Sequence, residues 1–205
     1  MKPKISLIIP VYNAEDTLLR ALNSVPLSDD VQVIIVDDGS TDRSWDIALG
    51  WWRDHAIEGN GSTIHRWEQN KGVAAAMNLG FNLARGEYIV SLSSDDWYVT
   101  DFDQFRPYLD GENDLVFFDL EVNDGSVWHI TPENKKLYVG AVKFIRREFM
   151  GETRVPDLKW HEDVPFTEQL YAKNPKEVFT GIVLKHYNFP RKGSLTWQAT
   201  HKEQK

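Results

Sequence analysis

The sequence predicts an α/β fold with a mostly parallel central sheet and an α+β second half. Within residues 1–98, short apolar runs alternate with segments whose apolar residues recur at helical spacing. Such alternation is typical of right-handed βαβ units, in which helices cover both faces of a Rossmann-like sheet. After this region the pattern changes to a short helix, strands and a hairpin turn. Because no repeat or long linker divides the chain, we expect one domain.

The boundaries of the expected elements follow from the hydrophobic periodicity. Strands are expected at residues 5–10, 31–36, 62–67, 88–92, 114–121 and 127–130. Helices are expected at residues 14–25, 42–55, 73–84, 102–109 and 164–171. Ser40 or Asp42 is the expected N-cap of the second helix. An Asn123-Asp124-Gly125 turn is expected to join the last two strands as a hairpin.

The composition excludes several classes of protein. The chain has 205 residues, a net charge of −8 at pH 7 and no cysteine. It therefore has neither disulfides nor thiolate zinc sites, and it lacks the basic character that binding to nucleic acid requires. No charged segment followed by an apolar run marks a signal peptide, and no apolar run is long enough to cross a bilayer. We expect a cytoplasmic protein with at most peripheral membrane association.

Two predicted strands end in paired carboxylates. Asp37 and Asp38 follow the predicted strand at residues 31–36. Asp95 and Asp96 follow the predicted strand at residues 88–92, after two serines. Ligands of open α/β sheets bind beyond the carboxyl ends of the strands, so both pairs are expected at one cleft. A cleft of this charge suits a cation, or hydrogen-bond donors such as ribose hydroxyls and a base N–H.

Each acidic pair has a structural and a functional interpretation. The segment from Asp37 to Asp42 is either a tight turn with Gly39 at positive φ, or a site where one carboxylate, free of capping, binds a base or ribose. The adjacent carboxylates of Asp95 and Asp96 repel each other and need a compensating charge. They therefore favour Mg²⁺ or Mn²⁺ bridged to a diphosphate.

Two later segments carry further candidates. Glu162 and Asp163 precede a helical pattern, where they either complement the helix dipole or provide a general base for a hydroxyl. His186 ends a strand before a basic loop, in which Arg191, Lys192 and Ser194 are suited to close over a diphosphate. No phosphate-binding loop, nucleophile elbow, zinc-protease motif or dinucleotide fingerprint is present, which excludes most hydrolases and dehydrogenases.

Taken in order, the motifs closely resemble those of family 2 glycosyltransferases over nearly the whole chain. They are Ile8 to Asn13, Val36 to Asp42, Asn70-Lys71-Gly72 with Asn78, Gly86 to Ile89, Ser94-Asp95-Asp96 and Glu162-Asp163. The resemblance implies a GT-A fold and an inverting, metal-dependent glycosyltransferase. Such an enzyme moves a sugar from a nucleoside-diphosphate sugar, here expected to be a UDP-sugar, to a hydroxyl of a glycan or glycoconjugate acceptor in polysaccharide biosynthesis.

The resemblance also implies roles for individual residues. Asp163 is the expected general base, with Glu162 beside it. The expected metal ligands are Asp95, Asp96 and His186. The expected donor-binding residues are Pro10, Val11, Tyr12, Asp38, Asn70, Lys71, Asn78, Ser94, Asp95, Arg191 and Ser194. Residues 1–98 would form the nucleotide-sugar-binding half, and residues 99–205 the acceptor-binding and catalytic-base half.

One departure from the family pattern bears on the metal. Many members have Asp-x-Asp-Asp where this chain has Ser93-Ser94-Asp95-Asp96, so a cation rests on fewer acids here. Trp97 and Trp160, each beside an acidic motif, are either core residues or platforms for a sugar ring. Two other functions stay open: a nucleotidyltransferase, although the first strand lacks a basic loop, and a catalytically silent sugar-binding module of a larger glycosylation assembly.

Overall fold

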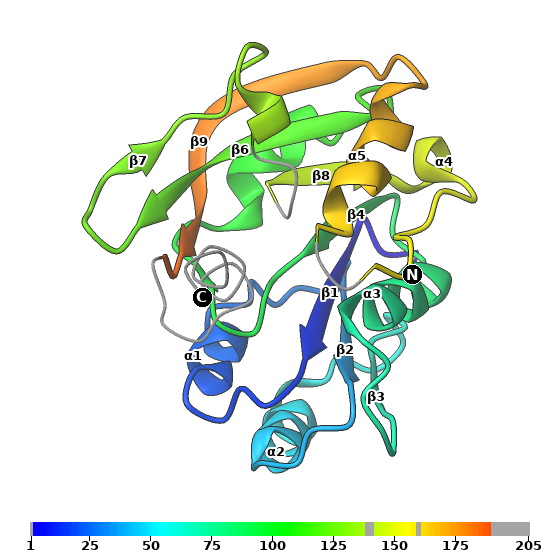
Figure 1. The fold of residues 1–205 in the computed structure, drawn as a ribbon, viewed down its shortest axis with the longest axis vertical. Helices are drawn as coiled ribbons and strands as arrows, with labels where there is room; N and C mark the ends of the chain where they lie inside the picture. Colours follow the sequence, from blue (N-terminus) through cyan, green and yellow to red (C-terminus); the bar gives the residue numbers. More distant parts are fainter. Residues whose placement is uncertain (1, 138–141, 159–160, 190–205) are drawn as a thin grey trace, which may run out of the picture.

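The computed structural model describes residues 2–137, 142–158 and 161–189, which fold around a nine-stranded sheet (Figure 1). The strand order is β3-β2-β1-β4-β8-β6-β9-β5, and β7 pairs with β6. The strands are β1 (Ile5–Val11), β2 (Val31–Asp37), β3 (Thr63–Arg66), β4 (Tyr88–Ser91), β5 (Trp97–Tyr98), β6 (Leu115–Val122), β7 (Val127–Trp128), β8 (Lys143–Arg146) and β9 (Glu177–Tyr187). The helices are α1 (Leu18–Asn23), α2 (Ser44–His55), α3 (Val73–Leu83), α4 (Arg147–Met150) and α5 (Asp163–Tyr171), with 3-10 helices η1 (Phe102–Tyr108) and η2 (Lys135–Leu137).

The first four strands form the predicted parallel sheet. Ile5 of β1 pairs with Val31 of β2 on one side and with Tyr88 of β4 on the other. Every residue of β2 is buried, as expected for a strand covered on both faces. Figure 1 shows α3 on one side of these strands and α1 on the other. A Cβ atom at Gly80 would lie 2.4 Å from Ile8, so the glycine lets α3 approach β1 closely.

Helix α1 is shorter than predicted, because the residues before it bind the loop that follows β2. The backbone N–H of Ala14 donates to the Ser44 hydroxyl at 2.7 Å, and that of Asn13 donates to the Ser40 hydroxyl at 3.0 Å. Asn13 itself has a left-handed backbone, with φ of 45°. These contacts keep the first residues of the predicted helix in a turn and tie the ends of β1 and β2 together.

The start of α2 distinguishes the two predicted N-caps. Arg43 occupies the N-cap position without a capping side chain. The carboxylate of Asp42, one residue earlier, accepts from the Ser44 N–H at 2.9 Å, whereas the Ser40 hydroxyl serves Asn13. The carboxylate is therefore the side chain that satisfies a first-turn N–H.

The second half continues the same sheet with mixed strand directions. Strand β8 is antiparallel to both β4 and β6, and β9 runs parallel to β6. The predicted turn joins β6 to β7, with Gly125 at φ of 81°. The segment predicted as a helix at 102–109 is the 3-10 helix η1, which contains Pro107 and so lacks one N–H donor. Strand β8 was not predicted, because its four residues begin with Lys143 and end with Arg146.

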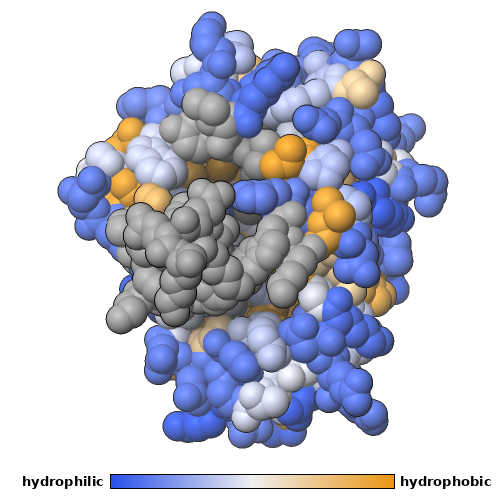
Figure 2. Space-filling view, in the orientation of Figure 1, coloured by the Kyte–Doolittle hydropathy of each residue, from blue (hydrophilic) through white to orange (hydrophobic). Residues whose placement is uncertain are grey.

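The face of the molecule seen in Figure 2 is mainly polar where its residues are described. Figure 2 shows a hydrophilic face on which apolar side chains form small, separate patches. Apolar side chains instead gather in the core, where Phe102, Phe105 and Phe118 all pack around Phe144. Among the described residues, none of the helices has the length and apolar character needed to cross a membrane.

Candidate functional site

The loops that follow β1, β2 and β4 are joined at the carboxyl edge of the sheet. The Asp38 N–H donates to the Val11 carbonyl at 2.8 Å, and the Leu92 N–H donates to the Ile8 carbonyl at 3.0 Å. The Thr17 hydroxyl, after β1, donates to the Ser94 carbonyl, after β4, at 2.9 Å. The two acidic motifs therefore lie on loops that meet at one edge, as the sequence predicts.

Asp38 organises a neighbouring loop. Its buried carboxylate accepts from the Asn70 side-chain amide at 3.0 Å and from the backbone N–H groups of Lys71 and Gly72 at 2.6 and 2.8 Å. Burial raises the pKa of Asp38, and the hydrogen bonds from Lys71 and Gly72 oppose that rise. The two loops pack closely, since a Cβ atom at Gly39 would lie 2.6 Å from the Gln69 carbonyl carbon.

The carboxylates of Asp37 and Asp38 both bind other residues of the protein, and the expected binding of a base or ribose stays a prediction. Asp37 forms an ion pair with Arg66 at 3.2 Å and accepts from the Ser40 N–H at 3.4 Å. Both oxygens of Asp38 bind the 70–72 loop. The motif thus shapes the rim of the site through the loop that it holds.

Tyr12, Asn70 and Lys71 present exposed side chains at this rim. The Tyr12 side chain lies at the end of β1 and is 48% exposed. The Lys71 ammonium lies 4.5 Å from the centre of the Trp67 ring. Val11 does not share this exposure, because its side chain is buried in the core, and its expected contact with the donor stays a prediction.

The side chain of Asn78, one of the expected donor-binding residues, holds another segment of the chain. Its side-chain amide donates to the Val155 carbonyl at 2.8 Å, and its side-chain oxygen accepts from the Val155 N–H at 2.9 Å. Both ends of the amide are therefore used to hold the segment before α5 against α3. This arrangement forms one wall of the pocket described below, which Val155 lines.

Asp95 and Asp96 have different surroundings. Asp96 is 1% exposed, lies 3.1 Å from the Lys185 ammonium, and accepts from the Asn188 N–H at 3.0 Å. Its charge is thus compensated by a buried lysine of β9, which ties the end of this strand to the acidic loop. Asp95 is only half-buried. Ser94 contributes its carbonyl to Thr17, as described above.

The predicted metal ligands do not form a cluster in the described part of the chain. One His186 nitrogen lies 2.9 Å from the Asn123 side-chain oxygen and the other lies 3.5 Å from Glu121. Over the described ranges, no three His, Asp or Glu side chains are grouped as a metal site would require. Asp96 and His186 each contact other residues of the chain, and these contacts keep them in separate parts of the site.

Trp97 is not a platform for a sugar. The His186 ring stacks on it with centroids 3.8 Å apart, and the Arg20 guanidinium lies 3.6 Å from the Trp97 ring centre. Two groups so close to one ring must occupy its opposite faces, so neither face is left for a ligand. Trp160, Arg191, Lys192 and Ser194, which were also predicted to contribute, lie outside the described residues.

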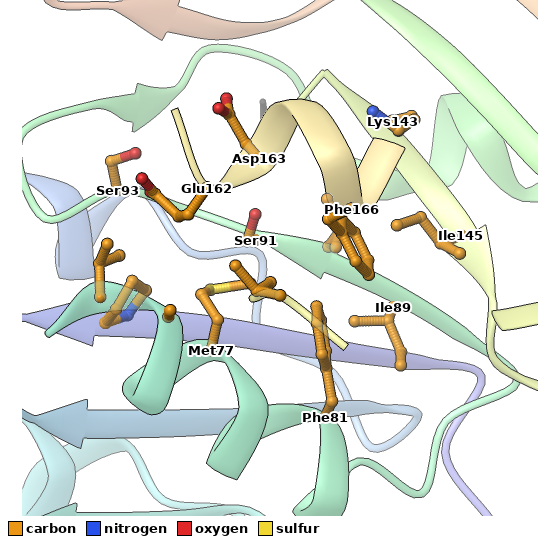
Figure 3. A pocket seen from close by; sticks show the side chains of 15 residues that line it. Met77, Phe81, Ile89, Ser91, Ser93, Lys143, Ile145, Glu162, Asp163 and Phe166 are labelled. Atoms are coloured by element: carbon orange, nitrogen blue, oxygen red, sulfur yellow. The ribbon is translucent and has the colours of Figure 1, made fainter. Parts of the chain in front are cut away.

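A pocket with a cavity of about 190 Å³ opens between α3, β4, β8 and α5 (Figure 3). Its apolar walls consist of Pro10, Val73, Ala74, Met77, Phe81, Ile89, Val90, Ile145, Val155 and Phe166. Its polar lining consists of Ser91, Ser93, Lys143, Glu162 and Asp163. Figure 3 shows the two acids at the start of α5, above the apolar residues of α3 and β4. The pocket therefore combines an apolar floor with a charged upper rim.

Glu162 and Asp163 are held where the chain enters α5. Glu162 is the N-cap residue, and burial raises its pKa while the neighbouring charge of Asp163 adds to that rise. Asp163 begins the helix, and its carboxylate makes no hydrogen bond or ion pair with any other described residue. A partly buried carboxylate at a pocket wall without a structural partner is suited to accept a proton from a bound hydroxyl.

Lys143 is a pocket residue that the sequence interpretation missed. It is 4% exposed, and burial lowers its pKa to about 8, while the negative charges of Asp163 and Glu177 oppose that fall. Its ammonium lies 5.8 Å from the centre of the Phe117 ring, on the neighbouring strand. The sequence did contain one signal, since Lys143 lies between the apolar residues Val142 and Phe144. A charged residue among apolar ones is rarely buried without a partner, so this pattern indicates a charge held by neighbouring groups.

The family model described as "Glycosyl transferase family 2" matches residues 6–180 of the chain. The chain belongs to this family. Among its relatives, glycosyltransferase GlyA of Streptococcus pneumoniae is 35% identical over 97% of this chain and 32% of its own length. An uncharacterized glycosyltransferase of Haemophilus influenzae is 31% identical over 95% of this chain and 81% of its own length. The chain thus spans about a third of GlyA.

Two solved structures share this fold. TarS of S. aureus, crystallised as residues 1–349 with UDP, aligns with a TM-score of 0.77 at 22% identity, over 90% of this chain and 60% of that one. Mannosyltransferase PcManGT of Pyrobaculum calidifontis, in complex with GDP-Man and Mn²⁺, aligns with a TM-score of 0.70 at 17% identity, over 97% of this chain and 60% of that one. These alignments confirm the predicted GT-A fold.

Proposed function

We propose that this chain transfers a sugar from a nucleoside-diphosphate sugar to a hydroxyl of a glycan or glycoconjugate. The observation that carries the proposal is the carboxylate of Asp163, which lines a pocket at the sheet edge and makes no hydrogen bond or ion pair with another described residue. Family membership supports the reaction class. A relative in Bacillus spizizenii, 38% identical over 84% of this chain, is a poly(ribitol-phosphate) beta-glucosyltransferase.

We propose a UDP-sugar as the donor, with its nucleotide at the rim formed by Tyr12, Asn70 and Lys71. The exposed phenol ring suits a nucleobase, and the lysine suits a phosphate. Structures of TarS contain UDP and UDP-GlcNAc, and an E. coli relative, 36% identical over 47% of this chain, is a UDP-Glc-dependent glucosyltransferase. GDP-Man in the Pyrobaculum enzyme is the main alternative donor type.

We propose that a divalent cation binds with the donor at Asp95. Asp95 is half-buried in the loop that follows β4 and so can be reached by a bound donor, whereas Asp96 is buried beside Lys185. A site with one carboxylate relies on the donor for its other oxygens, and Mg²⁺ binds in this manner through one or two carboxylates and substrate phosphates. When bound, the cation would neutralise charge on the departing diphosphate. Mn²⁺ in the Pyrobaculum complex supports this proposal.

In the proposed reaction, the oxygen of an acceptor hydroxyl attacks the anomeric carbon of the donor sugar. The bond from that carbon to the diphosphate oxygen breaks, and its electron pair leaves with the nucleoside diphosphate. Asp163 takes the hydroxyl proton as the new bond forms, and attack opposite the leaving group inverts the anomeric centre. The apolar floor around Met77, Phe81 and Phe166 would exclude water from the reacting atoms.

The proposal is tested by measuring release of nucleoside diphosphate from UDP-glucose, UDP-N-acetylglucosamine and GDP-mannose with Mn²⁺. Asp163→Asn keeps the shape of the side chain but cannot accept the proton, so turnover should fall by roughly 10²–10⁴-fold. Nucleotide affinity, measured by thermal shift, should stay within about twofold of the wild type.

Glu162→Gln is the matched control for this experiment, since it alters the adjacent carboxylate in the same way. Loss of turnover in Glu162→Gln with full activity in Asp163→Asn would reverse the two roles. A wild-type chain that binds these nucleotides but turns none of them over would contradict the proposal and identify a binding module.

A further inference from the structure

Lys143 is the cationic side chain in the described lining of the pocket, and the reaction scheme above does not use it. It begins β8 and contributes to the same cavity as Asp163, which begins α5. Figure 3 shows the two side chains on either side of the first turn of α5. A lysine that is 4% exposed needs opposite charge nearby, because removing an ammonium from water is costly.

The acids around Lys143 differ in the other charges that they meet. Asp163 faces it from α5 and Glu177 faces it from β9, and both favour its charged form. Glu177 already forms an ion pair with Lys135 of η2. Glu162, also from α5, lines the same pocket, whereas the adjacent β6 residue is the uncharged Phe117. Asp163 differs from Glu177 because its carboxylate forms no ion pair with another described cation.

We propose that Lys143 is a positioning residue for the transfer reaction, whose ammonium holds the Asp163 carboxylate charged and directed into the pocket. This inference rests on the proposed function, because it acts through the proposed base. A fixed positive charge beside the carboxylate orients it without forming a short hydrogen bond that would compete with the acceptor hydroxyl. The proposed effect is preorganisation of the base before the substrate arrives.

The proposal implies a particular dependence of turnover on pH. Burial lowers the pKa of Lys143 to about 8, so the ammonium loses its proton only slightly above neutral pH. Turnover should then fall by about tenfold for each pH unit above that value, as the charge that positions Asp163 disappears. A lysine with a purely structural role would leave the shape of the pH profile unchanged.

The experiment compares the release of UDP from UDP-glucose, with Mn²⁺ as above, from about pH 6 to 10 by wild-type protein, Lys143→Met and Lys143→Arg. Lys143→Met should lower turnover at neutral pH by roughly 10–100-fold and abolish the alkaline fall. Lys143→Arg keeps its charge throughout this range, so it should restore turnover at the alkaline end. Lys176→Met, which removes an exposed lysine paired with Glu112 on the surface, is the control for net charge and should keep the wild-type profile.

Two results distinguish the hypotheses. An alkaline fall that persists in Lys143→Met would overturn the role of Lys143 while leaving the proposed function intact. Absence of turnover of every nucleotide sugar by the wild type would instead contradict the proposed function. If Lys143→Met does not fold, Lys143→Gln provides a neutral, hydrogen-bonding replacement, and the same prediction applies to its pH profile.

Discussion

The ammonium of Lys185 lies 3.1 Å from the carboxylate of Asp96, and both side chains are almost completely buried. This pair joins β9 to the loop that follows β4, so a residue near the end of the described chain fixes the acidic motif near its middle. The carboxylate also accepts from the Asn188 N–H, which places the segment leaving β9 beside the same loop. The pair explains why two adjacent acids of one motif have different environments.

The first prediction concerns the stability that this ion pair supports. Lys185→Met leaves the buried carboxylate of Asp96 without compensation and should lower the free energy of unfolding by about 3–5 kcal/mol. The double variant Lys185→Met with Asp96→Leu removes both charges and should recover much of that loss. Urea denaturation measures both values. A double variant no more stable than the single one would show that packing, not charge, accounts for the effect.

The second prediction separates the two acids of the motif by their dependence on metal. Asp95→Asn should raise the Mn²⁺ concentration needed for half-maximal turnover by at least about tenfold, because Asp95 is the proposed ligand. Asp96→Asn should mainly lower the melting temperature, since Asp96 binds Lys185. Titration of Mn²⁺ into chelator-treated protein tests both variants. Full turnover of the wild type in excess EDTA would exclude a required cation.

The third prediction concerns the loop that Asp38 organises. Asp38→Ala leaves the N–H groups of Lys71 and Gly72 without their acceptor and should destabilise the protein by about 1–3 kcal/mol. UDP should also bind more weakly, because the loop forms part of the proposed nucleotide rim. Asp110→Ala is the matched control, since Asp110 also accepts two backbone N–H groups, in an exposed turn outside this site. Isothermal titration with UDP should show unchanged affinity for that control.

The sequence predicted the parallel half of the fold well, because local patterns determine it. The apolar runs of β1 and β2 are continuous and end in recognisable turns, and parallel strands buried on both faces have this appearance. The sequence also identified Glu162 and Asp163 beside a helix start, and the structure has α5 beginning there. The motif order correctly indicated the family and its fold.

The sequence was less informative where long-range contacts decide the role of a side chain. Nothing local to Asp96 reveals that Lys185, 89 positions later, compensates its charge. The partners of Asn78 lie at Val155, and Trp97 is covered by residues from α1 and β9. Lys143 escaped notice for the same reason, because β8 is short and the negative charges that act on Lys143 come from α5 and β9. Residue types indicate a possible chemistry, and tertiary contacts determine which residues are available for it.

The last prediction tests the buried lysine without relying on activity. The pKa of Lys143 is lowered to about 8 in the folded protein from an ordinary value of 10.5. Between these values the unfolded chain holds more protons on this side chain than the folded chain does, so stability rises with pH. The free energy of unfolding of the wild type minus that of Lys143→Met should therefore increase by roughly 2–3 kcal/mol across this window.

Taking the difference between the two proteins cancels the titration of groups that they share. Chemical denaturation at half-unit pH steps measures this difference, and Lys176→Met again provides the control. Lys176 pairs with Glu112 at the surface and its pKa is raised rather than lowered, so its difference curve should not rise over the same window. A flat curve for Lys143→Met would mean that the ammonium is solvated in the folded protein. The lysine would then lack the buried charge on which its proposed action on Asp163 depends.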